Sequence, residues 1–117
     1  MSNFTELKVW QKARVLAGAV YAATRSFPRQ EMFGLTQQMR RAAISIVSNL
    51  AEGHARYTHA DYASFVVIAR GSTAELEAQM IIAHDLEYID ETTKKSLAEK
   101  AEEIAKMLNA LINYLRR

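Results

Sequence analysis

The chain has 117 residues, of which 50% are hydrophobic and 24% charged, with one proline, four glycines and no cysteine. This length predicts a single domain over residues 1–117 that can bury a core. The absence of cysteine excludes disulfides and thiolate metal sites and fits a cytoplasmic protein, and no apolar run approaches the roughly 20 residues that span a bilayer.

The net charge of +2 is unevenly distributed along the chain. Residues 1–56 carry eight basic and three acidic residues, a net charge of +5, whereas residues 57–90 carry one basic and six acidic residues, a net charge of −5. Residues 91–117 return to +2. Such a split can guide self-association or attract a charged partner. The alternative is that oppositely charged helices simply lie side by side within one bundle.

The first predicted helix covers about residues 6–26 and ends before Pro28, because the residue preceding a proline is disfavoured in the α conformation. Its apolar residues follow the spacing of a core-facing helix surface: Val9, Ala13, Leu16, Val20 and Phe27. A second stripe of Trp10, Ala17 and Tyr21 lies beside the first. Two adjacent stripes indicate burial against something further, such as another subunit. Phe33, in the following connection, is expected to close the end of the bundle.

The second predicted helix covers about residues 35–52 and places Asn49 on a surface otherwise filled by apolar residues. Ser45 and Glu52 share that face, and buried polar groups need hydrogen-bond partners. We therefore predict a polar network between helices, formed by Ser45, Asn49, Glu52, Ser72 and Glu75. Gly53 is expected to cap the helix in a left-handed conformation.

The third predicted helix covers about residues 59–88 and begins with a capping pattern, Thr58 with Asp61. Gly71 falls in its middle, which indicates close approach of another helix, or alternatively a kink. The fourth helix covers about residues 93–115 and shows the most regular heptad spacing. Four long helices with short connections predict an all-α, antiparallel up-down-up-down four-helix bundle.

The sequence offers no recognisable catalytic constellation. It contains no Glu-x-x-His pair and no His-Glu-x-x-His motif, so we expect no metal. Ser45 and Ser72 have no histidine at helical spacing that could act as a base. We therefore expect no enzyme activity, no cofactor and no small-molecule substrate.

The basic residues indicate a charged partner instead. Arg40 and Arg41 diverge by about 100° on a helix, so one is expected to face solvent or a neighbouring subunit and the other to pair with Glu75 or Glu77. The 54–59 loop combines Arg56 with two histidines and a tyrosine, a composition that can bind phosphates and stack a base. A solvated loop is the alternative. The candidate nucleic-acid-binding residues are Arg14, Arg25, Arg29, Arg40, Arg41 and Arg56.

One pattern extends over nearly the whole chain. It begins with Phe4-x-x-Leu7-x-Val9-Trp10-x-x-Ala13 and Phe27-Pro28-x-x-Glu31. It continues with Gln38-x-Arg40-Arg41-Ala42-x-x-Ser45-x-x-x-Asn49-x-Ala51-Glu52-Gly53, then Arg56, then Gly71-Ser72-x-x-Glu75. This pattern resembles the 23S rRNA-intervening sequence protein family, whose members are often labelled four helix bundle proteins. The resemblance implies a homopentamer and a distant kinship with accessory proteins of diversity-generating retroelements, which bind nucleic acid and a reverse transcriptase. The family has no settled biochemical activity.

The chain departs from that family at Val47, where members often have proline. A proline there would remove a helical hydrogen bond, so the second helix is expected to be straighter in this chain. Two functional hypotheses follow from the sequence. One is a non-catalytic, homo-oligomeric cytosolic scaffold, based on the apolar width of the first and third helices, the charge split and the resemblance. The other is an accessory protein that binds RNA or DNA through a basic surface.

Overall fold

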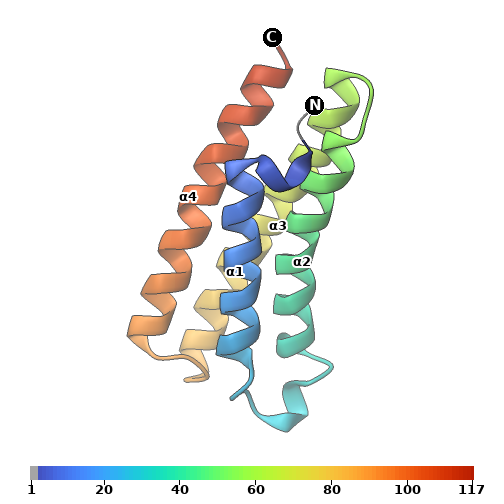
Figure 1. Ribbon diagram of the computed structural model, residues 1–117. Coiled ribbons are helices and arrows are strands. Elements are labelled where there is room, and N and C mark those ends of the chain that lie inside the picture. Colours follow the sequence, from blue (N-terminus) through green and yellow to red (C-terminus); the bar gives the residue numbers. More distant parts are fainter. Residues whose placement is uncertain (1–2) are drawn as a thin grey trace.

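The computed structural model describes residues 3–117, which form four long helices and two short 3-10 turns (Figure 1). The bounds are η1 Phe4–Glu6, α1 Lys8–Thr24, η2 Arg29–Glu31, α2 Leu35–His54, α3 His59–Asp85 and α4 Glu91–Leu115. Each helix packs against the next in the chain, and α1 also packs against α4. The helices therefore enclose one core, with α1 and α3 on a diagonal. The predicted all-α four-helix bundle is confirmed.

The core is built from the apolar seams of all four helices. The five seam residues predicted in the first helix, Val9 to Phe27, are all buried. They meet Met39 and Ile46 of α2, Leu76 of α3 and Leu108 of α4, each at most 1% exposed. Burial of such side chains contributes about 1.5–3 kcal/mol each, which is the main stabilising term of the bundle.

Side-chain caps determine where the helices begin. Asn3 caps η1 rather than a long first helix, since its Oδ1 accepts a 2.9 Å hydrogen bond from Thr5 N, and α1 begins only at Lys8. Thr58 Oγ1 accepts from Asp61 N at 3.1 Å, as the capping pattern predicted. Asp90 Oδ1 accepts from Thr93 N at 2.7 Å, so α4 begins at Glu91 and not at residue 93. These hydrogen bonds to Thr93 hold the pKa of Asp90 below its ordinary value.

Two predictions about helix ends are wrong. Gly53 is not a left-handed cap, because α2 continues through it to His54. A Cβ at Gly53 would lie 2.9 Å from Phe65 Cβ and 3.2 Å from the Tyr62 carbonyl oxygen. Glycine is therefore needed there for the close crossing of α2 and α3. The third helix ends at Asp85 rather than near residue 88, and the following turn places Glu87 at a φ of 62°.

The α1–α2 and α3–α4 connections lie at the same end of the bundle (Figure 1), and Glu31 rather than Phe33 links them. Phe33 is 84% exposed, so the expectation that it fills the bundle end is wrong. Glu31 Oε2 accepts a 2.9 Å hydrogen bond from Tyr88 Oη, and its Oε1 accepts one from Leu35 N at 3.2 Å. The carboxylate thus links η2 to the start of α2 and to the α3–α4 connection. Its hydrogen bond to Tyr88 raises the pKa of that phenol.

Candidate interaction surfaces

A polar network joins α2 to α3 near the middle of the bundle. Ser45 Oγ lies 2.8 Å from Ser72 Oγ, and Asn49 Nδ2 donates to Ser45 O at 2.9 Å and to Ser45 Oγ at 3.0 Å. These three side chains are half-buried. Glu52 and Glu75 are exposed, and in residues 3–117 neither forms a side-chain hydrogen bond with this network. The Ser45–Ser72 hydrogen bond therefore crosses from α2 to α3, while Asn49 holds Ser45 within α2.

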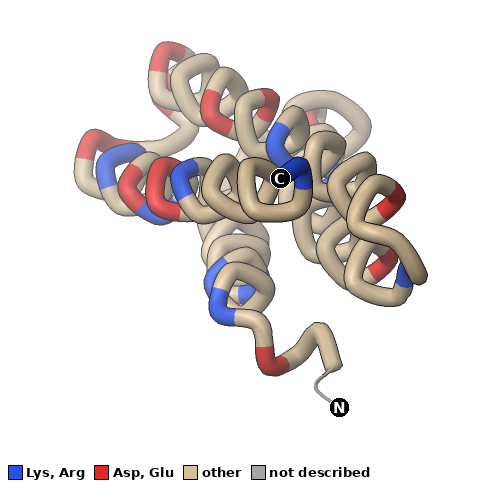
Figure 2. The backbone as a smooth tube through the Cα atoms, turned by 90° about the horizontal axis from the view of Figure 1, so that it is seen from above, with Lys and Arg blue, Asp and Glu red and all other residues tan. Residues whose placement is uncertain are grey.

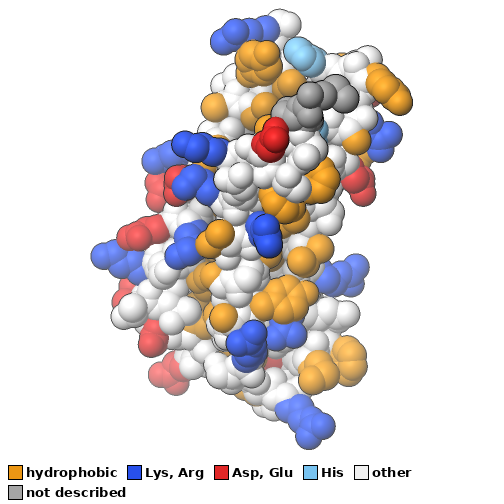
Figure 3. All heavy atoms as spheres, in the orientation of Figure 1, with side chains coloured by type: hydrophobic (Ala, Val, Ile, Leu, Met, Phe, Trp, Pro, Cys, Tyr) orange, Lys and Arg blue, Asp and Glu red, His pale blue; other side chains and the backbone are white. Residues whose placement is uncertain are grey.

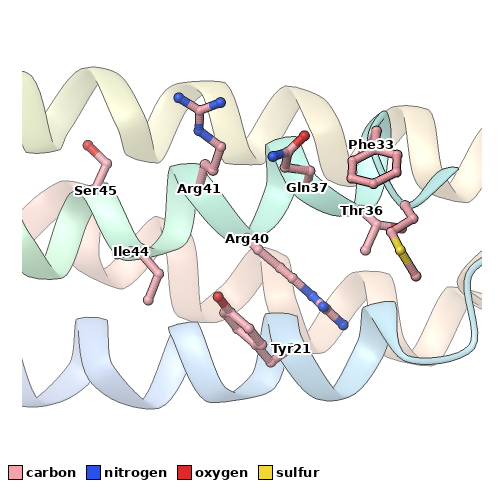
Figure 4. A pocket seen from close by; sticks show the side chains of 9 residues that line it. Tyr21, Phe33, Thr36, Gln37, Arg40, Arg41, Ile44 and Ser45 are labelled. Atoms are coloured by element: carbon pink, nitrogen blue, oxygen red, sulfur yellow. The ribbon is translucent and has the colours of Figure 1, made fainter.

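Arg40 lies in a groove between α1 and α2. Its Nε donates a 2.9 Å hydrogen bond to Thr24 Oγ1, and its guanidinium carbon lies 4.7 Å from the centroid of the Tyr21 ring. Figure 4 shows Arg40 extended alongside Tyr21, while Arg41 points away from it. We call this the α1–α2 groove, and its lining residues are Tyr21, Met32, Phe33, Thr36, Gln37, Arg40, Arg41, Ile44 and Ser45. Two arginines and no acidic residue line it, so the groove is basic and apolar at once.

The expected ion pair between this arginine pair and α3 is not formed. Within residues 3–117, no salt bridge joins Arg40 or Arg41 to Glu75 or Glu77. Arg40 turns toward α1 instead, because Thr24 and Tyr21 offer a hydroxyl acceptor and an aromatic face. Arg41 and Glu75 border a second, polar hollow beside Ser45 and Ser72.

The six arginines predicted to bind nucleic acid do not converge in one chain. Arg56 lies at the far end of α2 from Arg40, about 24 Å away along a helix that rises 1.5 Å per residue. Three of the six lie over aromatic rings of the bundle. The distance from the guanidinium carbon to the ring centroid is 5.8 Å for Arg14 and Trp10, 4.7 Å for Arg40 and Tyr21, and 4.5 Å for Arg56 and Phe65. Arg25 and Arg29 are exposed around the connection that follows α1.

The bundle end at Arg56 gathers residues that the sequence analysis did not connect. The C-terminus of α4 and the α2–α3 loop lie at the same end (Figure 1). The His59 and Tyr114 rings are 5.9 Å apart, and the Arg117 guanidinium carbon lies 5.3 Å from the Tyr114 ring centroid. Tyr57 in the loop is fully exposed. Antiparallel packing of the last two helices could have predicted this meeting of loop and C-terminus.

Charge is segregated by helix. Between Lys8 and Thr24, α1 has three basic residues and no acidic one, as the blue positions on this helix in Figure 2 show. On the side of the molecule that carries α1 and α2, hydrophobic and basic side chains are interspersed (Figure 3). By contrast, α3 carries Arg70 against four acidic residues. Arg70 Nε donates to Asn109 Oδ1 at 3.1 Å on the side facing α4.

The outward side of α3 is uncharged over most of its length. We call it the α3 outer face, and it comprises the exposed residues Val67, Gly71, Ala74, Ala78, Ile81 and Ile82. Val67 is 40% exposed, Ile81 52% and Ile82 49%. The first five residues follow a four-three-four-three spacing, the seam pattern of helices that pack against other helices. The sequence analysis noted the apolar width of this helix but missed the individual residues, which this spacing identifies.

Glycine at position 71 has no explanation inside the chain. A Cβ there would meet no atom within 4 Å, so the close helix approach expected from the sequence is absent from the single chain. Between Val67 and Ile82, α3 is therefore apolar on its outer as well as its inner side, with Glu75 and Asp85 exposed beside the outer face.

Known protein families and solved structures include matches to this chain. A sequence model of the 23S rRNA-intervening sequence protein family matches residues 5–110. The chain belongs to that family. A crystal structure described as a protein of unknown function from the S23 ribosomal protein family of Bacteroides thetaiotaomicron matches with a TM-score of 0.80 at 25% sequence identity. The match covers 89% of this chain and 97% of that one.

Among proteins with curated descriptions, none matches the chain significantly. Two further findings concern the part of the chain that the structure describes. No group of three or more histidine and acidic side chains is placed to hold a metal ion, and no helix is both long and apolar enough to cross a membrane.

Proposed function

We propose that this member of the 23S rRNA-intervening sequence protein family is a non-catalytic, homo-oligomeric cytosolic scaffold. The observation that carries the proposal is the α3 outer face. Between Val67 and Ile82 it extends about 22 Å along the helix, without a charged residue on it. Contiguous apolar surface of this kind marks interaction sites on proteins that are otherwise polar outside.

The resemblance described above adds an oligomer number to this proposal, because it implies five copies. A ring of copies would also repeat each exposed feature of the chain several times. A surface that binds a partner weakly in one copy binds far more strongly when several copies engage the partner together. Scaffolding and partner binding are therefore parts of one proposal.

The first experiment is the solution mass of the wild-type chain by size-exclusion chromatography with light scattering, from 1 to 100 µM. We expect a concentration-independent mass that is a multiple of 13.2 kDa, five-fold for a pentamer. A 13.2 kDa species throughout that range would overturn the proposal.

A second candidate function is binding of RNA or DNA. It is favoured by the excess of basic residues in α1 and by the bundle end where Arg56, Tyr57, Tyr114 and Arg117 lie. Arginines bind phosphates and release counterions, while exposed aromatic rings stack bases. Binding should therefore weaken steeply as salt rises.

Fluorescence anisotropy with labelled single-stranded RNA and DNA at 50 and 200 mM salt tests this function. Arg56→Ala and Arg41→Ala should each lower the slope of log affinity against log salt by about one. Lys106→Ala on α4 is the control, since Lys106 pairs with Glu102 at 3.3 Å and lies outside the predicted set. Affinity that is unchanged by salt, or equally reduced in the control, would contradict nucleic-acid binding.

A further inference from the structure

We infer that copies of this chain join head to tail, the α3 outer face of one copy seated in the α1–α2 groove of the next. This inference rests on the proposed self-association and specifies its two surfaces. Both surfaces are apolar in the middle and charged at the border. Together they account for exposed hydrophobic side chains on three of the four helices.

Four hydrophobic side chains that line the groove are exposed to solvent. Phe33 is 84% exposed, Met32 54%, Ile44 43% and Tyr21 38%. The groove lies between α1 and α2 and is hollowed enough to receive side chains from another helix (Figure 4). The small residues of the α3 outer face, Gly71, Ala74 and Ala78, allow a second backbone to approach closely. The groove supplies large side chains, and the face supplies room for them.

Charge decides which surface meets which. The groove is lined by Arg40 and Arg41 and by no acidic residue. The α3 outer face is bordered by Glu75 and Asp85, both exposed. Two α3 faces packed against each other would bring these carboxylates together, and two grooves would bring four arginines together. Only the contact between unlike surfaces pairs opposite charges, and complementary charge is what selects one arrangement among several.

The positions of the two surfaces allow one copy to use both at once. The groove is lined by residues of α1, α2 and the connection before α2, whereas the α3 outer face belongs to α3 alone, so the two surfaces share no residue. A contact between two different surfaces is heterologous, so repeating it produces a ring when the rotation closes. The open glycine at position 71 and the exposed Ile81 and Ile82 are then covered in every copy.

Two variants each block one surface. Ala78→Arg places a cation in the middle of the α3 outer face, opposite Arg40 and Arg41 of the next copy. Ile44→Glu places a carboxylate in the groove, opposite Glu75 of the next copy. Both positions are exposed in the chain, so folding should be retained. Each variant alone should weaken association about 100-fold, because each buries an unpaired charge.

The decisive measurement is an equimolar mixture of these two variants. The copy with Ala78→Arg keeps an intact groove, and the copy with Ile44→Glu keeps an intact α3 outer face, so one unaltered contact can form between them. We expect each variant alone to be monomeric by light scattering and the mixture to form a complex with equal amounts of both. Matched controls are Ala110→Arg on α4 and Val15→Glu on the α4 side of α1, which should leave the wild-type mass unchanged.

Four results would overturn this inference. If the Ile44→Glu variant stays assembled and the Ala78→Arg variant does not, two α3 outer faces pair with each other. If the Ala78→Arg variant stays assembled and the Ile44→Glu variant does not, two grooves pair with each other. A mixture in which both variants stay monomeric would show that the two surfaces are not partners. A wild-type chain that is itself monomeric would overturn the proposed self-association as well. Circular dichroism and melting confirm folding, and Ala74→Arg and Phe33→Asp replace any variant that fails to fold.

Discussion

Gly53 and Gly71 occupy similar positions in sequence terms, in the interior or last turn of a long helix, yet their surroundings differ completely. At Gly53 an added Cβ would lie 2.9 Å from Phe65 Cβ, whereas at Gly71 it would meet nothing within 4 Å. A glycine in a helix costs about 0.5–1 kcal/mol relative to alanine. The close packing of α3 on α2 offsets that cost at Gly53, and nothing in the single chain offsets it at Gly71. The difference shows that one side of α3 is closely packed within the chain and that the other is open at Gly71.

The largest effect that tests this comparison is expected from Gly53→Ala. The added methyl group would contact the Tyr62 carbonyl oxygen and Phe65 Cβ, which belong to a neighbouring helix and cannot rotate away. Overpacking of this kind costs about 1–3 kcal/mol. Urea denaturation followed by circular dichroism measures it. Gly18→Ala is the control, because a Cβ at Gly18 also meets nothing within 4 Å. Equal stability of Gly53→Ala and the wild type would show that this crossing has room to spare.

A second test concerns the turn of α3 that carries Gly71 outward and Ser72 inward. Asn49→Leu removes both hydrogen bonds to Ser45 and leaves the Ser45–Ser72 pair without its amide donor. We expect a loss of about 1 kcal/mol in the free energy of unfolding, with a change in solution mass if the α2–α3 register shifts. Arg56→Ala should do the reverse and weaken nucleic-acid binding more than it changes stability. An unaltered melting temperature and mass for Asn49→Leu would rule out a structural role for the network.

Much of this fold could be predicted because the core seams are local patterns. The four-three spacing from Val9 to Phe27 identifies a buried helix surface without reference to the other helices, and Thr58 with Asp61 marks a helix start by its own chemistry. Gly53 could not be assigned in this way. Glycine near a helix end ordinarily caps it, and only the tertiary crossing with Tyr62 and Phe65 reveals that it is a packing residue.

The interaction surfaces were harder to predict than the core for a related reason. One of Arg40 and Arg41 was expected to reach an acid on α3, but Arg40 contacts Thr24 and Tyr21 of α1 once the bundle forms. The groove combines Tyr21 of α1 with Met32 and Phe33 of the connection before α2 and with residues of α2 itself, so no single stretch of sequence displays it. The α3 outer face is the exception. Its spacing is fully visible in the sequence, and only its exposure needed the structure.

The smallest expected effect is also the sharpest test of the comparison, because Gly71→Ala should act differently in the free and the assembled chain. In an Ala78→Arg background, where the chain is expected to be monomeric, alanine at position 71 should stabilise α3 by about 0.5–1 kcal/mol. In the wild-type background the same methyl group would press against the copy seated on the α3 outer face, and the gain should shrink or reverse. A double-mutant cycle on urea midpoints isolates this difference. An equal gain in both backgrounds would mean that no copy packs on Gly71, and its glycine would then be without a structural reason.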